Sequence, residues 1–270
     1  MKQGYASNDR VSLTLGDQGV AHVRLTRADQ RNALDAAMVA ALLDAGGALF
    51  DQPGLRCVVL SGEGSSFCAG LDRATIEGAL ADQGLNLAER SHGNANRFQQ
   101  LALQWRKLPV PVIAAVQGGC IGGGLQIAGG ADIRIVAPDA RLAVMEMRWG
   151  LVPDMGGFAL WRGLVREDVL RALTYTNREF SGEEALALGF ATELAADPLA
   201  RALALADEIA TRSPTAIRAA KALFARAWDA PLGEILQEES YAQQRLLGSR
   251  NQVEAVRSQM ERSPPLFTDP

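Results

Sequence analysis

The sequence is poor in the residues that build disulfide frameworks or metal centres, with three cysteines and two histidines among 270 residues. Cys57, Cys68 and Cys120 are odd in number and lie far apart, so they show neither a disulfide framework nor the paired spacing of a zinc site. A reducing, cytoplasmic location fits this cysteine usage best.

Long apolar runs are also missing. No stretch approaches the roughly 18 apolar residues that a membrane span needs, and the first 17 residues are polar and mixed in charge. Neither secretion nor membrane insertion is indicated. A formal net charge of -4 and a pI near 5.4 give no general reason to bind nucleic acid. With 48% hydrophobic residues the chain can bury a sizeable core, and a small molecule is the expected partner.

Two common catalytic motifs are absent. No glycine-rich loop is followed by the Lys and Ser/Thr of a phosphate-binding P-loop, and no G-x-S-x-G segment occurs. His22 falls in an expected early strand and His92 in a polar loop, so a Ser-His-Asp triad is not supported. For His92 a solvated surface role is favoured over ligand contact.

The pattern that remains is typical of α/β architecture, in which strands, glycine loops and helices recur. We expect Asn32 to cap the first helix and residues 61–66 to form a loop. Residues 74–107 are polar with weak helical periodicity and receive no assignment. The expected strands are 11–15, 20–25, 57–60, 112–116 and 133–136, and the expected early helices are 32–50 and 125–129.

The last third is mostly helical. Ser181 and Glu184 have the spacing of a capping box, and Asp197-Pro198 and Ser213-Pro214 read as helix starts with proline in the first turn. Residues 199–224 carry apolar side chains at helical spacing. Core packing or subunit contact is the expected role of these helices.

Two loops place backbone amides after buried strands, residues 67–72 and residues 122–125. Three successive glycines, Gly122 to Gly124, let a ligand approach the main chain and open a helix whose first N-H groups are unpaired. This arrangement suits an anion, although glycines also permit tight packing of a helix on a strand.

Two carboxylates lie in apolar surroundings. Glu146 follows Val144-Met145, and Asp154 lies between Pro153 and Met155. An acid in such a context is either paired structurally or held with a raised pKa for proton transfer.

Together these segments resemble the crotonase, or enoyl-CoA hydratase/isomerase, superfamily over nearly the whole chain. Several motifs in the right order are specific where a single one is not. The matching segments are Arg31-Asn32-Ala33-Leu34, Phe67-Cys68-Ala69-Gly70, Pro111-Val112-Ile113-Ala114-Ala115-Val116-Gln117-Gly118, Gly122-Gly123-Gly124 and Ala131-Asp132.

The resemblance implies a backbone oxyanion hole made by the amides of Leu71 and Gly123, which would stabilise charge on a thioester oxygen. It also implies a catalytic acid at Glu146. The second glutamate of the hydratases is replaced by Gln126, which cannot exchange protons but could orient water or substrate. Asp154 matches an acid of the double-bond isomerases, so we predict Glu146 and Asp154 as the acid-base pair; the alternative is that Asp154 caps the helix beginning near Gly156.

The resemblance further implies contacts with coenzyme A by Arg31, Ala69 and Arg262, the last of these reaching a neighbouring subunit. For each arginine a surface role is the alternative. Trp149 and Trp161 are expected to pack the core or line the acyl pocket.

The implied fold is an α/β spiral of repeated β-β-α units over residues 1–200 with a helical trimerisation region over residues 201–270. The implied substrate is a 2-enoyl- or dienoyl-CoA, in a homotrimer or a dimer of trimers. No metal and no separate cofactor is expected, because the thioester supplies the electron sink. The alternatives are another acyl-CoA reaction on this fold, such as hydrolysis or decarboxylation, or a CoA-binding protein that has lost catalysis.

Overall fold

The computed structural model describes residues 3–4, 9–72, 74–75, 78 and 86–270. Within these residues a large sheet has the strand order β1-β2-β3-β4-β6-β8-β11, and a small sheet has the order β10-β9-β7-β5. The strands are β1 Gln3–Gly4, β2 Val11–Leu15, β3 Val20–Leu25, β4 Cys57–Gly62, β5 Ser66–Cys68, β6 Val112–Val116, β7 Gly119–Ile121, β8 Ile133–Val136, β9 Arg141–Ala143, β10 Phe180–Ser181 and β11 Glu193–Leu194.

Helices surround the two sheets. The α-helices are α1 Ala36–Phe50, α3 Arg97–Lys107, α4 Gly123–Gly129, α5 Gly157–Trp161, α6 Glu167–Thr176, α7 Gly182–Leu188, α8 Pro198–Ala210, α9 Pro214–Ala227, α10 Leu232–Leu246 and α11 Arg250–Glu261, and the 3-10 helices are η1 Ala28–Gln30 and η2 Glu146–Trp149.

Each central strand of the large sheet leads into a short strand of the small sheet. β4 is followed by β5, β6 by β7 and β8 by β9, and within each sheet these strands pair in parallel. α3 follows the first such pair and α4 the second. The chain therefore winds as a spiral of β-β-α units, which confirms the predicted fold class.

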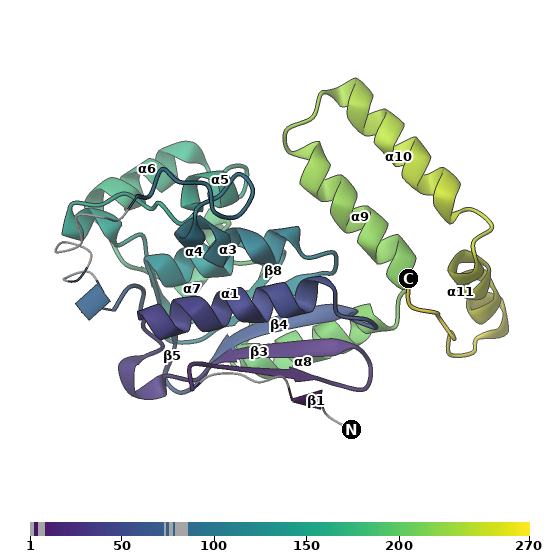
Figure 1. Ribbon diagram of the computed structural model, residues 1–270, viewed down its shortest axis with the longest axis horizontal. Coiled ribbons are helices and arrows are strands. Elements are labelled where there is room, and N and C mark those ends of the chain that lie inside the picture. The colour runs from purple at the N-terminus through teal and green to yellow at the C-terminus, as the bar shows by residue number, and fades with distance from the viewer. Residues whose placement is uncertain (1–2, 5–8, 73, 76–77, 79–85) are drawn as a thin grey trace.

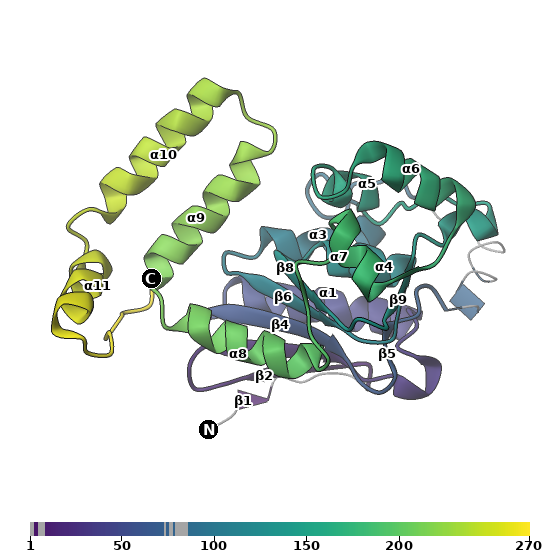
Figure 2. The same ribbon diagram turned by 180° about the vertical axis from the view of Figure 1, so that it is seen from behind.

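The large sheet is covered on both faces. α1 and α3 lie over one face, while α8 lies across the other, as Figure 1 and Figure 2 show from opposite sides. β4 and β6 are buried along their whole length, as expected of continuous apolar strands between two helical layers.

The C-terminal helices differ in how they meet this body. α8 starts just before the expected boundary at residue 200 and packs on the sheet through Ala202 and Ala206, which are fully buried. α9 is joined to this body by its buried Lys221, which donates to the carbonyl oxygen of Val110 at 2.6 Å and pairs with Asp132 at 2.7 Å. α10 and α11 stand apart from the two sheets (Figure 1). No helix in the described part of the chain is long and apolar enough to cross a membrane.

In the second half of the chain, helices begin at the capping residues that the sequence predicts. Ser181 and Glu184 form both hydrogen bonds of a capping box, and Asp197 and Ser213 cap α8 and α9 ahead of their first-turn prolines. The predictions of these three helix starts are confirmed.

Two predictions in the first half were wrong. Asn32 does not cap the first helix: Asp35 does, by accepting a hydrogen bond from the amide of Met38. Asn32 has a φ of 57° and points its buried amide group at the carbonyl oxygens of Glu63 and Ser66. Residues 61–66 are not all loop either, because β4 continues to Gly62 and β5 begins at Ser66.

The region 74–107 had no predicted structure. Part of it lies outside the described residues, and residues 97–107 form α3, which begins after a capping box at Asn96.

Candidate active site

A cavity of about 610 Å³ opens where three turns of the spiral meet. The turn after β5 contributes Leu71, the turn between β7 and α4 contributes Gly123, and η2 contributes Glu146. Its other lining residues are Arg31, Ser65, Ser66, Ala69, Gly70, Gly118, Gly119, Ile121, Gly122, Arg141, Met145, Arg148, Trp149, Leu151 and Glu179. Residues separated by 75 positions in the sequence thus share one pocket.

The turn of Leu71 is held from behind by Leu34. The amide of Leu34 donates to the carbonyl oxygen of Gly70 at 2.8 Å, and the amide of Asp72 donates to the carbonyl oxygen of Leu34 at 3.1 Å. Because successive amides of an extended chain point to opposite sides, the amide of Leu71 faces away from Leu34. It finds no acceptor among the described residues.

The turn of Gly123 lies directly against this segment. Gly70 has a φ of 85°, and a Cβ atom there would lie 2.7 Å from the carbonyl oxygen of Ile121 and 3.6 Å from the amide nitrogen of Gly123. Only glycine allows this backbone conformation and this close approach. Gly123 is the first residue of α4, so its amide has no acceptor within the helix.

Glu146 brings a buried carboxylate to the same cavity. Its side chain is 9% exposed, and its Oε2 atom has no hydrogen-bond partner in the described part of the chain. Burial raises the pKa of Glu146 above its ordinary value, and the charge of Asp154 adds to this effect. The free oxygen of a carboxyl group that resists ionisation is suited to proton transfer.

Gln126 directs its hydrogen bonds to protein groups. Its Nε2 atom donates to Oε1 of Glu146 at 2.6 Å, and its Oε1 atom accepts from the amides of Met155 at 2.8 Å and Gly157 at 2.9 Å. The side chain is 1% exposed. Gln126 therefore fixes one oxygen of Glu146 and leaves the other free.

Asp154 is half-buried beside this network and does not line the cavity formed by the described residues. Burial raises its pKa as well. It does not cap α5, which begins after Gly156 without a side-chain cap. The alternative prediction, that Asp154 caps the helix beginning near Gly156, is therefore wrong.

The residues expected to hold coenzyme A fall into two groups. Arg31 and Ala69 line the cavity, and the amide of Ala69 donates to the carbonyl oxygen of Arg31 at 3.0 Å. Arg262 ends α11 with a φ of 52° and lies outside the cavity of its own chain. Its expected contact with a neighbouring subunit stays a prediction.

Two arginines at the cavity were missed from the sequence. Arg141 forms an ion pair of 2.6 Å with Glu179, and Arg148 lies on η2 close to Glu146 in sequence. Arg141 immediately precedes the apolar run 142–145 that leads to Glu146, a signal that could have been used. Trp149 also lines the cavity, whereas Trp161 is buried in the core.

Neither histidine is among the residues that line the cavity. His22 accepts or donates a hydrogen bond of 2.7 Å with Ser61, and His92 pairs with Ser91 in the 86–96 segment. Among the described residues no group of three His, Cys, Asp or Glu side chains is arranged to hold a metal ion.

Comparison with known proteins gives a consistent result. The family model described as enoyl-CoA hydratase/isomerase matches residues 16–270. The human mitochondrial Delta(3,5)-Delta(2,4)-dienoyl-CoA isomerase is 30% identical over 263 residues, which covers 94% of this chain and 80% of that protein. Enoyl-CoA hydratase EchA19 of Mycobacterium tuberculosis is 35% identical over 203 residues, 73% of each chain.

Solved structures agree with the sequence relatives. An enoyl-CoA hydratase from Mycobacterium tuberculosis H37Rv superposes with a TM-score of 0.84 at 28% identity, covering 97% of this chain and 99% of the other. The similarity therefore extends over the entire spiral and the C-terminal helices.

Proposed function

The chain belongs to the enoyl-CoA hydratase/isomerase family, and on that premise we propose that it moves a double bond in a dienoyl-CoA by transferring protons between two carbons. The observation that carries the proposal is that Glu146, whose buried Oε2 atom has no hydrogen-bond partner among the described residues, lines the same cavity as Leu71 and Gly123.

The chemistry needs two protons handled at different carbons. Conversion of a 3,5-dienoyl-CoA to a 2,4-dienoyl-CoA removes a proton from C2 and adds one at C6. The electron pair released at C2 is delocalised onto the thioester oxygen and along the chain to C6. Two amides that donate to this oxygen stabilise the intermediate by about 3 kcal/mol each.

Glu146 is the base at C2 in this scheme. Its carboxylate lies beside Gly122, where a Cβ atom would be 3.3 Å from Oε1, and so it lies next to the amide that would hold the thioester oxygen. C2 is bonded to the thioester carbon, which makes it the acyl carbon nearest to this position.

Asp154 is the acid at C6. It lies on the turn before α5, next to Met155, whose amide donates to the same Gln126 side chain that holds Glu146. In this scheme the acyl chain extends from the cavity toward this turn. A raised pKa keeps a carboxyl group protonated, as a proton donor requires. The charge of Asp154 also contributes to the raised pKa of Glu146, so ionisation of both carboxyl groups at once is disfavoured.

Hydration by two carboxylates is disfavoured by Gln126. The amide cannot take or give a proton, and both lone-pair directions of its oxygen are used by the amides of Met155 and Gly157. We therefore assign Gln126 a positioning role for Glu146 rather than the orientation of water.

Arg31, Ala69 and the newly identified Arg141 and Arg148 are the proposed contacts of coenzyme A, whose phosphates need cationic partners. No separate cofactor is required, because the thioester accepts the electron pair. Three free, buried thiols fit a reducing compartment such as the cytoplasm.

A homotrimer, or a dimer of trimers, is the proposed assembly. The outlying helices expose large apolar side chains, which a single chain leaves in contact with water. They include Phe224, Leu232, Leu236, Tyr241, Val253 and Met260.

The test is to assay crotonyl-CoA hydration and 3,5-dienoyl-CoA isomerisation side by side. We expect isomerisation in the wild type and a loss of kcat of about 100-fold or more in both Glu146→Gln and Asp154→Asn. Glu183→Gln, which changes an exposed carboxylate on α7, serves as the control. Equal rates in all four proteins would refute the proton-transfer assignment, and binding without turnover would favour a CoA-binding protein.

A further inference from the structure

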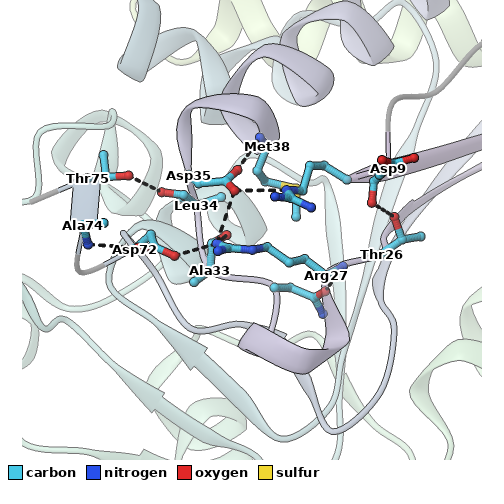
Figure 3. A network of polar contacts seen from close by, with 12 residues as sticks. Asp9, Thr26, Arg27, Ala33, Leu34, Asp35, Met38, Asp72, Ala74 and Thr75 are labelled. Atoms are coloured by element: carbon cyan, nitrogen blue, oxygen red, sulfur yellow. Dashed lines mark hydrogen bonds and ion pairs between the residues drawn. The ribbon is translucent and has the colours of Figure 1, made fainter. Parts of the chain in front are cut away.

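Two ion-paired side chains hold the turn that carries the Leu71 amide. Asp72 follows Leu71 directly, and its Oδ2 atom lies 2.6 Å from Nη1 of Arg27. Its Oδ1 atom accepts a hydrogen bond of 2.9 Å from the amide of Ala74. Both carboxylate oxygens are therefore used, one on each side of the turn, as Figure 3 shows.

Arg27 is itself fixed at several points. Its Nη1 atom donates to the carbonyl oxygen of Ala33 at 3.1 Å and lies 3.5 Å from Oδ2 of Asp35. Asp35 caps α1 and also pairs with Arg10 at 3.0 Å. Alternating charges thus run from Arg10 through Asp35 and Arg27 to Asp72, and they connect the start of α1 with the cavity.

This cluster is partly shielded from water. The side chains of Arg27 and Asp72 are each 15% exposed, so their attraction is screened less than that of a surface pair. The hydrogen bond from Arg27 is the main reason that the pKa of Asp72 lies below its ordinary value. Asp72 therefore stays ionised at neutral pH.

The cluster acts on the same residues that orient Leu71. The two main-chain hydrogen bonds of Leu34 hold Gly70 and Asp72, and Arg27 holds the Asp72 side chain and the carbonyl oxygen next to Leu34. Both ends of the bridge between Leu34 and Leu71 are thus tied to one guanidinium group. The direction of the Leu71 amide depends on this bridge.

We propose that Arg27 and Asp72 are positioning residues for the oxyanion hole, acting through the ion pair that orients the Leu71 amide. The inference rests on the proposed function, because it gives the amide a catalytic role. A misplacement of about 1 Å in such a donor can cost about 100-fold in rate, so a geometric device at this point has a kinetic effect beyond its effect on folding.

The experiment uses the full-length protein with a saturated acyl-CoA labelled with ¹³C at the thioester carbonyl, which binds without isomerising. The carbonyl stretching band of the bound ligand is recorded by infrared difference spectroscopy, because hydrogen bonds to the oxygen lower its frequency. Asp72→Asn removes the ion pair with little change in volume, Arg27→Gln removes the guanidinium group and shortens the side chain, and Arg27→Lys keeps the charge but loses the planar fork. Circular dichroism and thermal denaturation establish that each variant is folded.

The control is Arg56→Gln. Arg56 is also 15% exposed and also forms an ion pair, of 2.7 Å with Asp269, but it lies outside the cavity. A purely structural role for an ion pair predicts the same spectrum and kcat in all variants once folding is established.

We expect the wild type and Arg56→Gln to lower the carbonyl frequency equally. In Asp72→Asn and Arg27→Gln the lowering is reduced and kcat for the isomerisation falls about 10- to 100-fold, with KM changed less than about threefold; Arg27→Lys lies between these and the wild type. If both variants lower the carbonyl frequency as much as the wild type does, the positioning role is wrong, while the oxyanion hole stands. A wild-type protein that leaves the band at its solution position overturns the oxyanion hole itself, and the positioning role with it.

Discussion

The Nε2 atom of Gln126 donates a hydrogen bond of 2.6 Å to Oε1 of Glu146, while the other end of the same amide accepts from Met155 and Gly157. One side chain thus connects the carboxylate on η2 with the turn that follows Asp154. The relative placement of the two acids depends on this connection.

Replacement of Gln126 by leucine tests that dependence. The change leaves the amides of Met155 and Gly157 buried without an acceptor, so we expect the free energy of unfolding to fall by about 2–4 kcal/mol. Urea denaturation measures this loss. Gln104→Leu is the matched control: Gln104 is also buried, its amide donates to the carbonyl oxygen of Leu42, and it lies outside the cavity. If Gln126→Leu lowered the free energy of unfolding no more than Gln104→Leu does, the hydrogen bonds of Gln126 would contribute no more to stability than those of another buried glutamine.

The pH dependence of stability follows from the raised pKa of Glu146. A folded state that binds this proton more tightly than the unfolded state loses stability as the pH rises from the ordinary glutamate pKa of about 4.3 through the raised value. Glu146→Gln removes this cost, so the inactive variant should be more stable than the wild type at pH 7 by about 1 kcal/mol. The difference should vanish below pH 4. Chemical denaturation at both pH values checks this, and a variant less stable at pH 7 would contradict it.

The pH dependence of the rate should have two limbs. Protonation of Glu146 removes the base at low pH, and ionisation of Asp154 removes the acid at high pH, so kcat/KM is expected to be bell-shaped. A profile recorded for Asp154→Asn should lose the high-pH limb; retention of both limbs would assign the acid elsewhere.

The three thiols should be inert in the folded protein. Burial raises the pKa of Cys57 and of Cys68 to about 12 and that of Cys120 well above its ordinary value. Thiolates are the reactive form, so a disulfide reagent should modify no cysteine in native buffer and all three after unfolding in urea. Modification of one cysteine per native chain would contradict this prediction, because a strand that carries a buried thiol would have to open to solvent.

The assembly can be tested on the outlying helices. Leu232 and Met260 are 74% and 80% exposed in a single chain, and Leu232→Asp combined with Met260→Asp should shift the mass measured by light scattering from a trimer toward a monomer. Tyr175→Asp changes a comparably exposed side chain, 65%, on α6 and should leave the mass unchanged. A monomeric wild type would refute the trimer.

Local chemistry predicted much of this fold. Asp197-Pro198 and the Ser181 to Glu184 capping box start helices because their hydrogen bonds are made within a few residues. The prediction for Asn32 was wrong for the opposite reason. Its side-chain oxygen accepts from the amide of Arg27, but its side-chain nitrogen donates to Glu63 and Ser66, which are more than 30 residues away, and no nearby residue indicates these contacts.

The candidate site was also predictable only in part, because some of its contacts join residues that are distant in sequence. Leu71, Gly123 and Glu146 were identified as one site through the order of several motifs, and the structure brings all three to one cavity. The engagement of Gln126 with two amides near Asp154, and that of Arg27 with Asp72, could not be predicted, because they are tertiary contacts between residues about 20 to 45 positions apart.

The most direct test of the central claim is proton exchange in D₂O followed by NMR. A 3,5-dienoyl-CoA is incubated with the wild type, Glu146→Gln and Asp154→Asn. We expect the wild type to form a 2,4-dienoyl-CoA with deuterium at C6, Asp154→Asn to exchange the C2 hydrogens of the substrate with little conversion, and Glu146→Gln to do neither. Exchange at C2 by Glu146→Gln at the wild-type rate would contradict the account.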